Sequence, residues 1–453
     1  MTEVRIKLSS CRSAGLRVVY ALCGKLVCLA ASCDDDPPVG PAPVDPTTEP
    51  PPAIEQVWTR EIHRLDGYST GISPQPIDDG EIVVVLHAGD SLSNVLYHFD
   101  PESGAVVDSF LIDDPVFGFG DITEYAPGLR IGDDYVAKVD QWPFRLSLRD
   151  GSVRWVLSTT YTWGSVHGGR LYAERFTDWG QPPLLGVIDL ETGIVVDSIG
   201  PPPGYDYADR KGGYDAVRAF ERPDGSGLVI AATLHSIPRD RLRERDWEAT
   251  RYAFDAETHE ILWAHRIGHG AYSPSPHSPV YFDGILAQSV YDTVYGYDAR
   301  TGEERWAYHF KHTPFPSGVE TTTRPDNRGD AQAVGASPVL DEATGTACFG
   351  SLNSFQYCLE VATGREVWRG GTGSGSFGSG MALLGDGLLS NTRGQRLNLL
   401  DRHTGEVLAE ARRVSARGDF FNAPYYDPAR RLLVATDGAR AIGYRVNVEP
   451  PGE

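Results

Sequence analysis

A short phrase recurs along the chain and constrains the fold more than any other feature. In YDARTGEERW the fixed positions are Asp298, Gly302 and Trp306, and related phrases place their turn residue at positions 104, 151, 193, 259, 302, 364 and 405. Six of the seven copies carry an acid four residues before the turn residue. Most intervals are 41 to 47 residues and two are longer. A repeat of this period predicts a solenoid or a propeller.

Each copy predicts two strands joined by a tight turn. The acid can accept hydrogen bonds from the turn amides, and the glycine supplies a positive φ. A second strand pair precedes the turn, as in SPVL and TACFG before FQYCLEV and REVWRG. Each unit is therefore a four-stranded antiparallel sheet, and repeated sheets of this size indicate an all-β propeller.

The number of blades predicted is eight. After the seventh phrase, FNAPYYDPARRLLVATDGARAIGYRVN gives three strands only, and the strand around Trp58 supplies the missing fourth. We predict an eight-bladed β-propeller over residues 54–448 whose last blade is closed by the N-terminal strand, followed by a tail at 449–453. Pairing of the N-terminal strand with the last blade covers the sheet edge that would otherwise be left open where the ring closes.

The phrase Asp-x-x-Thr-Gly-x-x-x-Trp closely resembles the tryptophan-docking repeat of pyrroloquinoline-quinone-type (PQQ-like) propellers, over roughly residues 54–448. That group includes quinoprotein alcohol dehydrogenases and the lipoprotein propeller of the outer-membrane β-barrel assembly machinery. The resemblance implies that each tryptophan packs between neighbouring blades. The docking residues expected are Trp58, Trp155, Trp263, Trp306, Trp368, Gly104, Gly193, Gly302, Gly364 and Gly405.

Residues 1–33 have the layout of a secretory signal peptide, with a basic start, an apolar run and small residues before Cys33. LAASC resembles a bacterial lipobox, which implies lipidation of Cys33. A cleaved signal without lipid and an uncleaved anchor remain alternatives. Residues 34–53 contain eight prolines and predict an extended linker between the anchor and the folded body.

Residues for catalysis or cofactor binding are not expected. The quinoproteins of the family carry adjacent cysteines on the quinone, and this chain has no adjacent cysteine pair and no C-x-x-C-H. His265, His269 and His277 lie where a strand runs into a loop, so we interpret them as ordinary loop and strand residues. Cys348 and Cys358 flank a hairpin, and registers that allow a disulfide and registers that forbid it are both open.

Strand order predicts which end of the propeller carries function. The Thr-Gly turns join third and fourth strands, so all share one rim, while the insertions at 200–215, 236–250 and 311–335 belong to the opposite rim. Loops on a rigid scaffold commonly bind partners. We predict a binding rim there, with packing of the rings onto their own loops as the alternative. Its aromatic residues are Trp142, Trp179, Tyr205, Tyr207, Trp247 and Phe315.

The functional prediction is a non-catalytic lipoprotein of the cell envelope, periplasmic or on the outer surface, whose monomeric propeller is a protein-binding or assembly scaffold without cofactor. A net charge of −21 argues against nucleic-acid binding, and contact with the membrane is expected through the lipid anchor only. The alternatives are a quinoprotein-like enzyme or sensor with a site in the central channel, and a surface propeller that binds glycans or other cells.

Overall fold

The computed structural model describes residues 54–448 with internal gaps. The signal segment with Cys33, the linker 34–53 and the tail 449–453 lie outside the described residues. The internal gaps are 62–71, 78–79, 89–92, 113–127, 140–141, 158–163, 176–179, 239–246, 271–278, 291–292, 311–337, 351–354, 372–380, 386, 394–395, 413–421 and 438–439.

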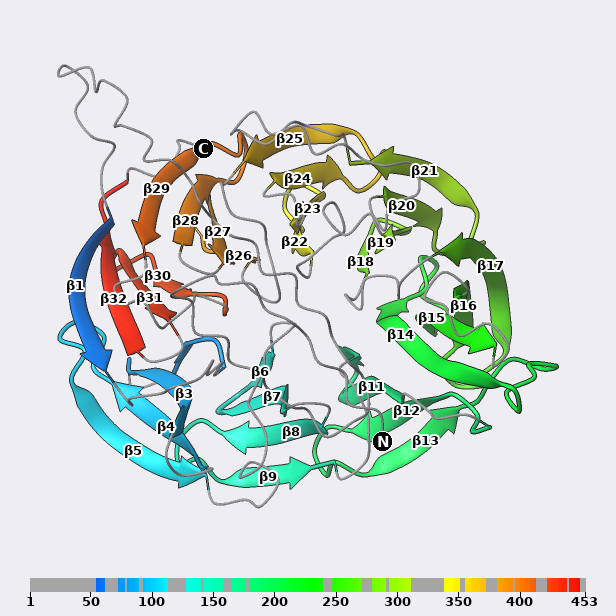
Figure 1. Cartoon of the computed structure of the whole chain (residues 1–453), viewed down its shortest axis with the longest axis horizontal. Helices are drawn as coiled ribbons and strands as arrows, with labels where there is room; N and C mark the ends of the chain where they lie inside the picture. The colour runs from blue at the N-terminus through cyan, green and yellow to red at the C-terminus, as the bar shows by residue number, and fades with distance from the viewer. Residues whose placement is uncertain are drawn as a thin grey trace, which may run out of the picture. The chain divides into compact units, whose positions relative to one another are not determined.

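Every regular element in this part of the chain is a strand, and the strands form eight four-stranded antiparallel sheets. Figure 1 shows the sheets standing in a ring, with the first strand of each sheet toward the centre and the fourth outermost. The fold predicted from the repeat, an eight-bladed β-propeller, is confirmed. No described helix has the length and hydropathy needed to cross a membrane.

The first four blades follow the chain in order. Blade 1 is β2 (Gln75–Pro76), β3 (Ile82–Ala88), β4 (Ser93–Phe99) and β5 (Val106–Ile112); blade 2 is β6 (Leu129–Ile131), β7 (Asp134–Val139), β8 (Trp142–Ser147) and β9 (Val153–Val156). Blade 3 is β10 (Ser165–His167), β11 (Arg170–Arg175), β12 (Leu184–Asp189) and β13 (Val195–Ile199); blade 4 is β14 (Arg210–Glu221), β15 (Leu228–Pro238), β16 (Trp247–Asp255) and β17 (Ile261–Gly270).

The remaining blades complete the ring. Blade 5 is β18 (Val280–Phe282), β19 (Ile285–Val290), β20 (Thr293–Asp298) and β21 (Glu304–His309); blade 6 is β22 (Val339–Asp341), β23 (Thr346–Gly350), β24 (Phe355–Glu360) and β25 (Glu366–Gly371). Blade 7 is β26 (Met381–Leu383), β27 (Leu388–Arg393), β28 (Arg396–Asp401) and β29 (Val407–Arg412). Blade 8 is β30 (Tyr425–Asp427), β31 (Leu432–Thr436) and β32 (Arg440–Val446), and β1 (Ile54–Glu61) pairs antiparallel with β32 as its outer strand.

In the Thr-Gly turns of blades 3, 5, 6 and 7 the glycine amide donates to the carbonyl of the acid four residues before it, at 2.8 Å. In the turn of blade 3, the Asp189 carboxylate accepts hydrogen bonds from the amide of Thr192 at 2.9 Å and from its hydroxyl at 2.8 Å. The amide of Gly193 donates to the Asp189 carbonyl at 2.8 Å, with a glycine φ of 69°. These bonds, the Thr192 hydroxyl first, lower the pKa of the Asp189 carboxyl. The acid of the phrase therefore shapes a turn.

Each of the five tryptophans crosses to the next blade. The indole N–H donates to the carbonyl of the residue that follows the acid of the next turn, from Trp58 to Pro101 (2.8 Å), Trp155 to Leu190 (2.9 Å), Trp263 to Ala299 (3.0 Å), Trp306 to Val361 (3.0 Å) and Trp368 to Arg402 (2.7 Å). The turn glycine of that next blade lies beneath the ring. A Cβ added at Gly104, Gly193, Gly302, Gly364 or Gly405 would lie 2.2–2.5 Å from an indole atom.

The core lies between the blades. Val136 and Trp155 of blade 2, for example, share an apolar cluster with Leu171 and Ile188 of blade 3. Burial of such side chains stabilises the ring by roughly 1.5–3 kcal/mol each. Because every cluster of this kind joins two neighbouring blades, docking residues and sheet faces act together to hold the blades in order.

Candidate functional site

Blade 1 lacks the docking tryptophan, and a histidine has taken over its contact. Asp108 occupies the tryptophan position, and its strand partner His98 is 5% exposed. The Nε2 of His98 lies 2.8 Å from the carbonyl oxygen of Leu148 in blade 2, and its Nδ1 lies 2.9 Å from the Glu81 carboxylate. An imidazole therefore makes the contact between blades that an indole makes elsewhere, and a carboxylate holds the ring from its other nitrogen.

Blade 3 also lacks the tryptophan. At its contact with blade 4, both the tryptophan and the turn glycine of the repeat are replaced by other residues. Asp197 fills the tryptophan position, and the turn residue of blade 4 beneath it is His259, with a φ of 59°. The His259 Nε2 and the Asp197 carboxylate are 3.4 Å apart. In the blades with a tryptophan, the turn residue beneath the indole is glycine. Here the turn residue is a histidine, and its imidazole lies against a carboxylate.

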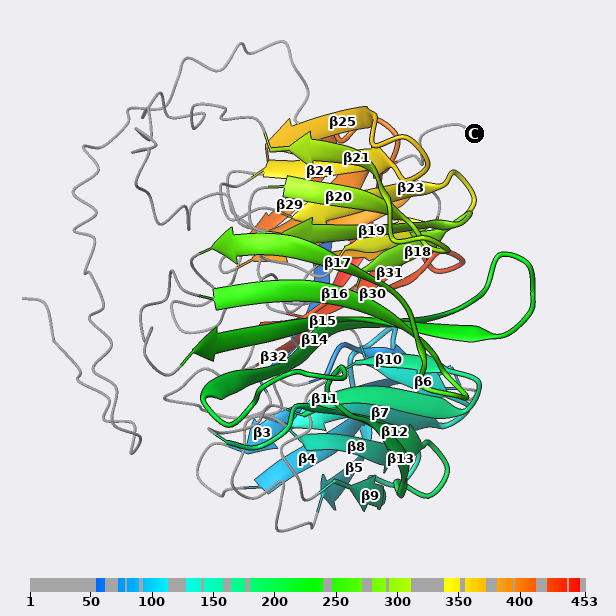
Figure 2. The same ribbon diagram turned by 90° about the vertical axis from the view of Figure 1, so that its right-hand side faces the viewer.

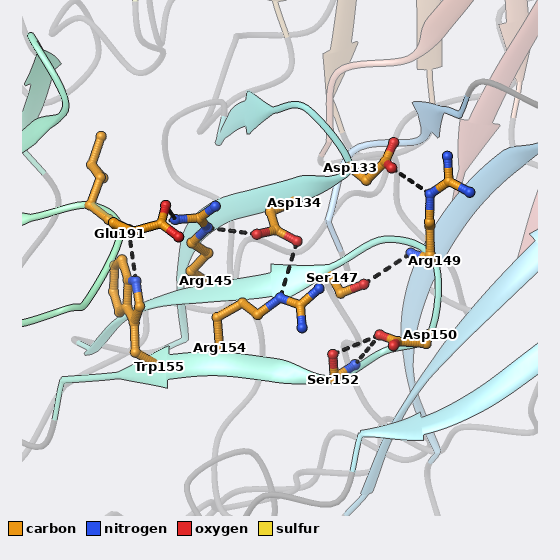
Figure 3. A network of polar contacts seen from close by, with 11 residues as sticks. Asp133, Asp134, Arg145, Ser147, Arg149, Asp150, Ser152, Arg154, Trp155 and Glu191 are labelled. Carbon is orange, nitrogen blue, oxygen red and sulfur yellow. Dashed lines mark hydrogen bonds and ion pairs between the residues drawn. The ribbon is translucent and has the colours of Figure 1, made fainter.

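At the contact between blades 2 and 3, an arginine lies beside the docking tryptophan. Arg145 donates to Asp134 at 2.7 Å, to Glu191 at 2.8 Å and to the Leu190 carbonyl at 2.9 Å, the same carbonyl that Trp155 reaches (Figure 3). The Arg145 side chain is only 11% exposed. A buried guanidinium is tolerated because its donors meet two carboxylates and a carbonyl.

The neighbouring acidic doublet is occupied by cations of the protein itself. Asp133 is ion-paired with Arg149, and Arg154 lies 3.4 Å from Asp134 (Figure 3). Asp133 lies in the turn before β7, and Asp134 is the first residue of that strand. In the described parts of the chain, no three His, Cys, Asp or Glu side chains are grouped to hold a metal ion. His277 and the side chain of His269 lie outside the described residues.

A second buried polar cluster lies between blades 4 and 5. The His235 Nε2 is 2.7 Å from the Asp215 carboxylate, in a strand that bulges at Ala216 with a φ of 50°. Arg251 is 1% exposed, lies 4.8 Å from the centre of the Tyr297 ring, and burial lowers its pKa to about 10. The cation–π contact offsets part of the cost of burying the guanidinium. The contact of Arg251 with Tyr297 joins blades 4 and 5, whereas His235 and Asp215 pair within blade 4.

Blade 4 projects beyond its neighbours on the rim opposite the Thr-Gly turns. Its third strand, β16, has 9 residues, whereas β12, β20 and β24 have 6 each. At 3.3–3.4 Å per residue, the difference is about 10 Å. Figure 2 shows the ends of β15 and β17 reaching beyond those of β21 and β25.

These long strands correct two sequence interpretations. The stretch 200–215, predicted as a connection, becomes strand β14 from Arg210, and the loop predicted over 236–250 is shortened by strand at both ends. Gly212, which belongs to the predicted connection, lies inside β14. A Cβ there would lie 1.9 Å from the His235 carbonyl oxygen, so this glycine permits close approach of β15.

The connection 200–209 is held firmly on the projecting end. The Tyr214 hydroxyl donates to the Gly200 carbonyl at 2.7 Å. Arg210 donates to the Ser236 hydroxyl at 2.9 Å and to Glu248 at 2.8 Å, and its guanidinium lies 5.9 Å from the centre of the Tyr205 ring. Tyr205 itself is half-buried against the core cluster of blades 3 and 4, and burial raises its pKa.

The predicted rim aromatics divide into three groups. Trp142 and Tyr205 are partly buried and pack against core clusters, as the alternative interpretation expects. Tyr207 is 37% exposed and lies between the exposed acids Asp206 and Asp209. Trp179, Phe315 and the side chain of Trp247 lie outside the described residues.

The two cysteines of the folded part are joined in the structure. Cys348 of β23 and Cys358 of β24 lie directly opposite each other and form a disulfide. Both belong to the apolar cluster between blades 6 and 7, with Trp368, and Cys358 is fully buried. The disulfide therefore lies within a joint between blades.

Comparison with known proteins finds a related family. A family model described as outer membrane protein assembly factor BamB matches residues 235–347 and 357–448, a little under half of the chain. The chain is a PQQ-like β-propeller. No curated protein sequence matches the propeller.

Solved structures share its fold at low sequence identity. The quinohemoprotein alcohol dehydrogenase ADHIIG of Pseudomonas putida HK5 is 13% identical, with a TM-score of 0.59 over 88% of this chain and 77% of that chain. The quinohemoprotein alcohol dehydrogenase of Comamonas testosteroni is 12% identical, with a TM-score of 0.54 over 89% and 78%. BamB from Moraxella catarrhalis is 14% identical, with a TM-score of 0.49 over 87% and 100%. At these identities the likeness to the two alcohol dehydrogenases concerns the fold alone, and no conclusion is drawn from the likeness to BamB.

Proposed function

We propose that the propeller is a non-catalytic scaffold of the cell envelope and binds a protein partner on the rim opposite the Thr-Gly turns. The observation that carries the proposal is the match to the outer-membrane assembly-factor family over blades 4 to 8. The projecting end of blade 4 supports the choice of rim, because it reaches beyond its neighbours and holds the connection that carries the exposed Tyr207.

The chemistry of that surface favours a basic partner. Tyr207 is exposed between Asp206 and Asp209, while Arg210 beside them is already engaged by Glu248. The exposed charge of the connection is thus negative. Complementary charge on a partner would steer association and fix its orientation. Tyrosine suits the centre of such a contact because it combines a large apolar ring with a hydroxyl.

Photo-crosslinking in cells tests this assignment. A photoreactive phenylalanine analogue replaces Tyr207 in one variant and Arg300, an exposed residue of a Thr-Gly turn on the other rim, in the matched control. We expect a discrete protein adduct from position 207, absent from position 300. Equal adducts from both positions, or none from 207 in a folded and correctly located protein, would reject the rim.

We propose that Cys33 is lipidated and that residues 34–53 form the tether to the propeller. Cys33→Ser should then move the protein from the membrane to the soluble envelope fraction while leaving the urea midpoint of the propeller unchanged. Retention in the membrane after this substitution would contradict lipidation and favour an uncleaved anchor. This outcome is independent of the crosslinking result.

A further inference from the structure

A cavity of about 220 Å³ opens between blades 6 and 7 on the rim of the Thr-Gly turns. Its lining includes Asp341, Thr346, Cys348, Glu360, Arg365 and Arg402. Strand pairing gives its depth. Thr346 stands opposite Asp341 and Glu360, whereas Cys348 lies two residues further along β23, opposite Cys358. The cavity therefore runs from a charged mouth toward the disulfide.

One cysteine of the disulfide is among the residues that line this cavity. Cys348 lines it and is 4% exposed, whereas Cys358 is not part of the lining and is fully buried in the apolar cluster with Trp368 and Leu400. Thiol–disulfide exchange needs a thiolate to approach one sulfur along the S–S axis, with the other sulfur as leaving group. A thiolate that enters the cavity would therefore meet Cys348 first, which makes Cys358 the leaving group.

The mouth presents both signs of charge. Arg365 lies 3.2 Å from Glu360, and Arg402 lies 3.7 Å from Asp341. An incoming molecule with a carboxylate and an ammonium can pair with both signs at once, whereas a neutral molecule gains nothing there. The volume is below the 300–1,000 Å³ typical of drug-sized pockets and suits a molecule about as large as an amino acid.

We propose that this cavity is a site of covalent modification, at which a small zwitterionic aminothiol of the amino-acid class opens the Cys348–Cys358 disulfide and remains on Cys348. The thiolate sulfur of the aminothiol forms a new S–S bond with the Cys348 sulfur. The Cys348–Cys358 bond breaks, its electron pair goes to the Cys358 sulfur, and this thiolate takes a proton from solvent. One disulfide is exchanged for another, so the step needs no further oxidant or reductant.

The test exposes the native, oxidised protein to L-cysteine or to the uncharged thiol 2-mercaptoethanol at equal thiolate concentration. Samples are quenched in acid, and the modified cysteine is located by peptide mass spectrometry. We expect L-cysteine on Cys348, a free thiol on Cys358, and a rate about three- to tenfold above that of the uncharged thiol, since two partly exposed ion-pairing sites contribute.

Two variants and a matched control separate the cavity from general reactivity. Arg402→Gln and Arg365→Gln should each bring the two rates closer together. Arg305→Gln, which changes the corresponding arginine–acid pair of the blade 5 turn, should leave their ratio unchanged. Equal rates for the two thiols, modification of Cys358 first, or no reaction before the protein is denatured would overturn the proposal.

Discussion

Replacement of Gly302 by alanine tests whether the repeated glycine serves the tryptophan or only the turn. Gly302 has a φ of 72°, and a Cβ there would lie 2.5 Å from the Trp263 ring. The left-handed backbone costs roughly 1–2 kcal/mol for alanine. Displacement of the buried indole adds about 1–3 kcal/mol, as for an overpacked core. We expect Gly302→Ala to lower the free energy of unfolding by about 2–5 kcal/mol in total.

Gly132→Ala is the matched control. Its φ is 60°, and an added Cβ meets no atom within 4 Å, so this variant carries the backbone cost alone. Urea unfolding followed by circular dichroism gives both values, provided that the m-values agree. A loss for Gly302→Ala no larger than that for Gly132→Ala would refute the argument that the indole requires the glycine.

A double-mutant cycle with Trp263→Ala isolates the contact itself. Removal of the indole costs about 3–5 kcal/mol alone. In that background Gly302→Ala should cost only the backbone share, about 1–2 kcal/mol, because no ring opposes the new methyl group. Full additivity of the two substitutions would show that Gly302 and Trp263 act independently.

The remaining predictions use the same unfolding measurement. His98→Ala should cost about 1–3 kcal/mol because the buried Leu148 carbonyl loses its partner, while the Glu81 carboxylate is partly exposed and can bind water instead. Asp197→Asn should cost less than about 1 kcal/mol, because its contact with His259 is exposed. The Ser152 hydroxyl and amide lower the pKa of Asp150 from 3.8 to about 2, so this carboxylate stabilises the fold above about pH 4 and loses that contribution as the pH falls toward 2; Asp150→Asn should flatten the acid limb of a stability–pH profile. Tyr214→Phe should cost about 0.5–1.5 kcal/mol and should also weaken crosslinking from position 207.

The sequence predicts the blades well because their signal is local and repeated. Asp298, Gly302 and Trp306 lie within one hairpin, and the spacing of this phrase alone indicates the turn and the following strand. The exchange at blade 3 could also be inferred from the repeat. The one copy with a turn histidine, His259, follows a copy in which Asp197 replaces the tryptophan. These two positions are in contact between neighbouring blades, which explains why both residues change together.

Other contacts had no local signal. His98 lies 50 residues from the carbonyl that it contacts and outside the repeated phrase, so nothing distinguished it from other histidines of the chain. The stretch 200–215 was predicted as a connection, because composition does not tell whether a glycine bends the chain or admits a neighbouring backbone, as Gly212 does. Blade 4 was therefore predicted too short, and its projecting end was missed.

The joint between blades 3 and 4 is stabilised in a way that bears on the proposed binding rim. Its outer contact, Asp197 with His259, is partly exposed and weak, but Tyr214 and Val217 of the innermost strand β14 pack into a core cluster with Leu185 of blade 3. The same strand fixes the connection to blade 4 through the Tyr214 hydroxyl. Apolar side chains buried near the centre of the ring thus join these two blades in place of a tryptophan contact at the outer edge. Because the residues that join these blades also position the segment around Tyr207, loosening this joint should disturb partner binding before it unfolds the propeller.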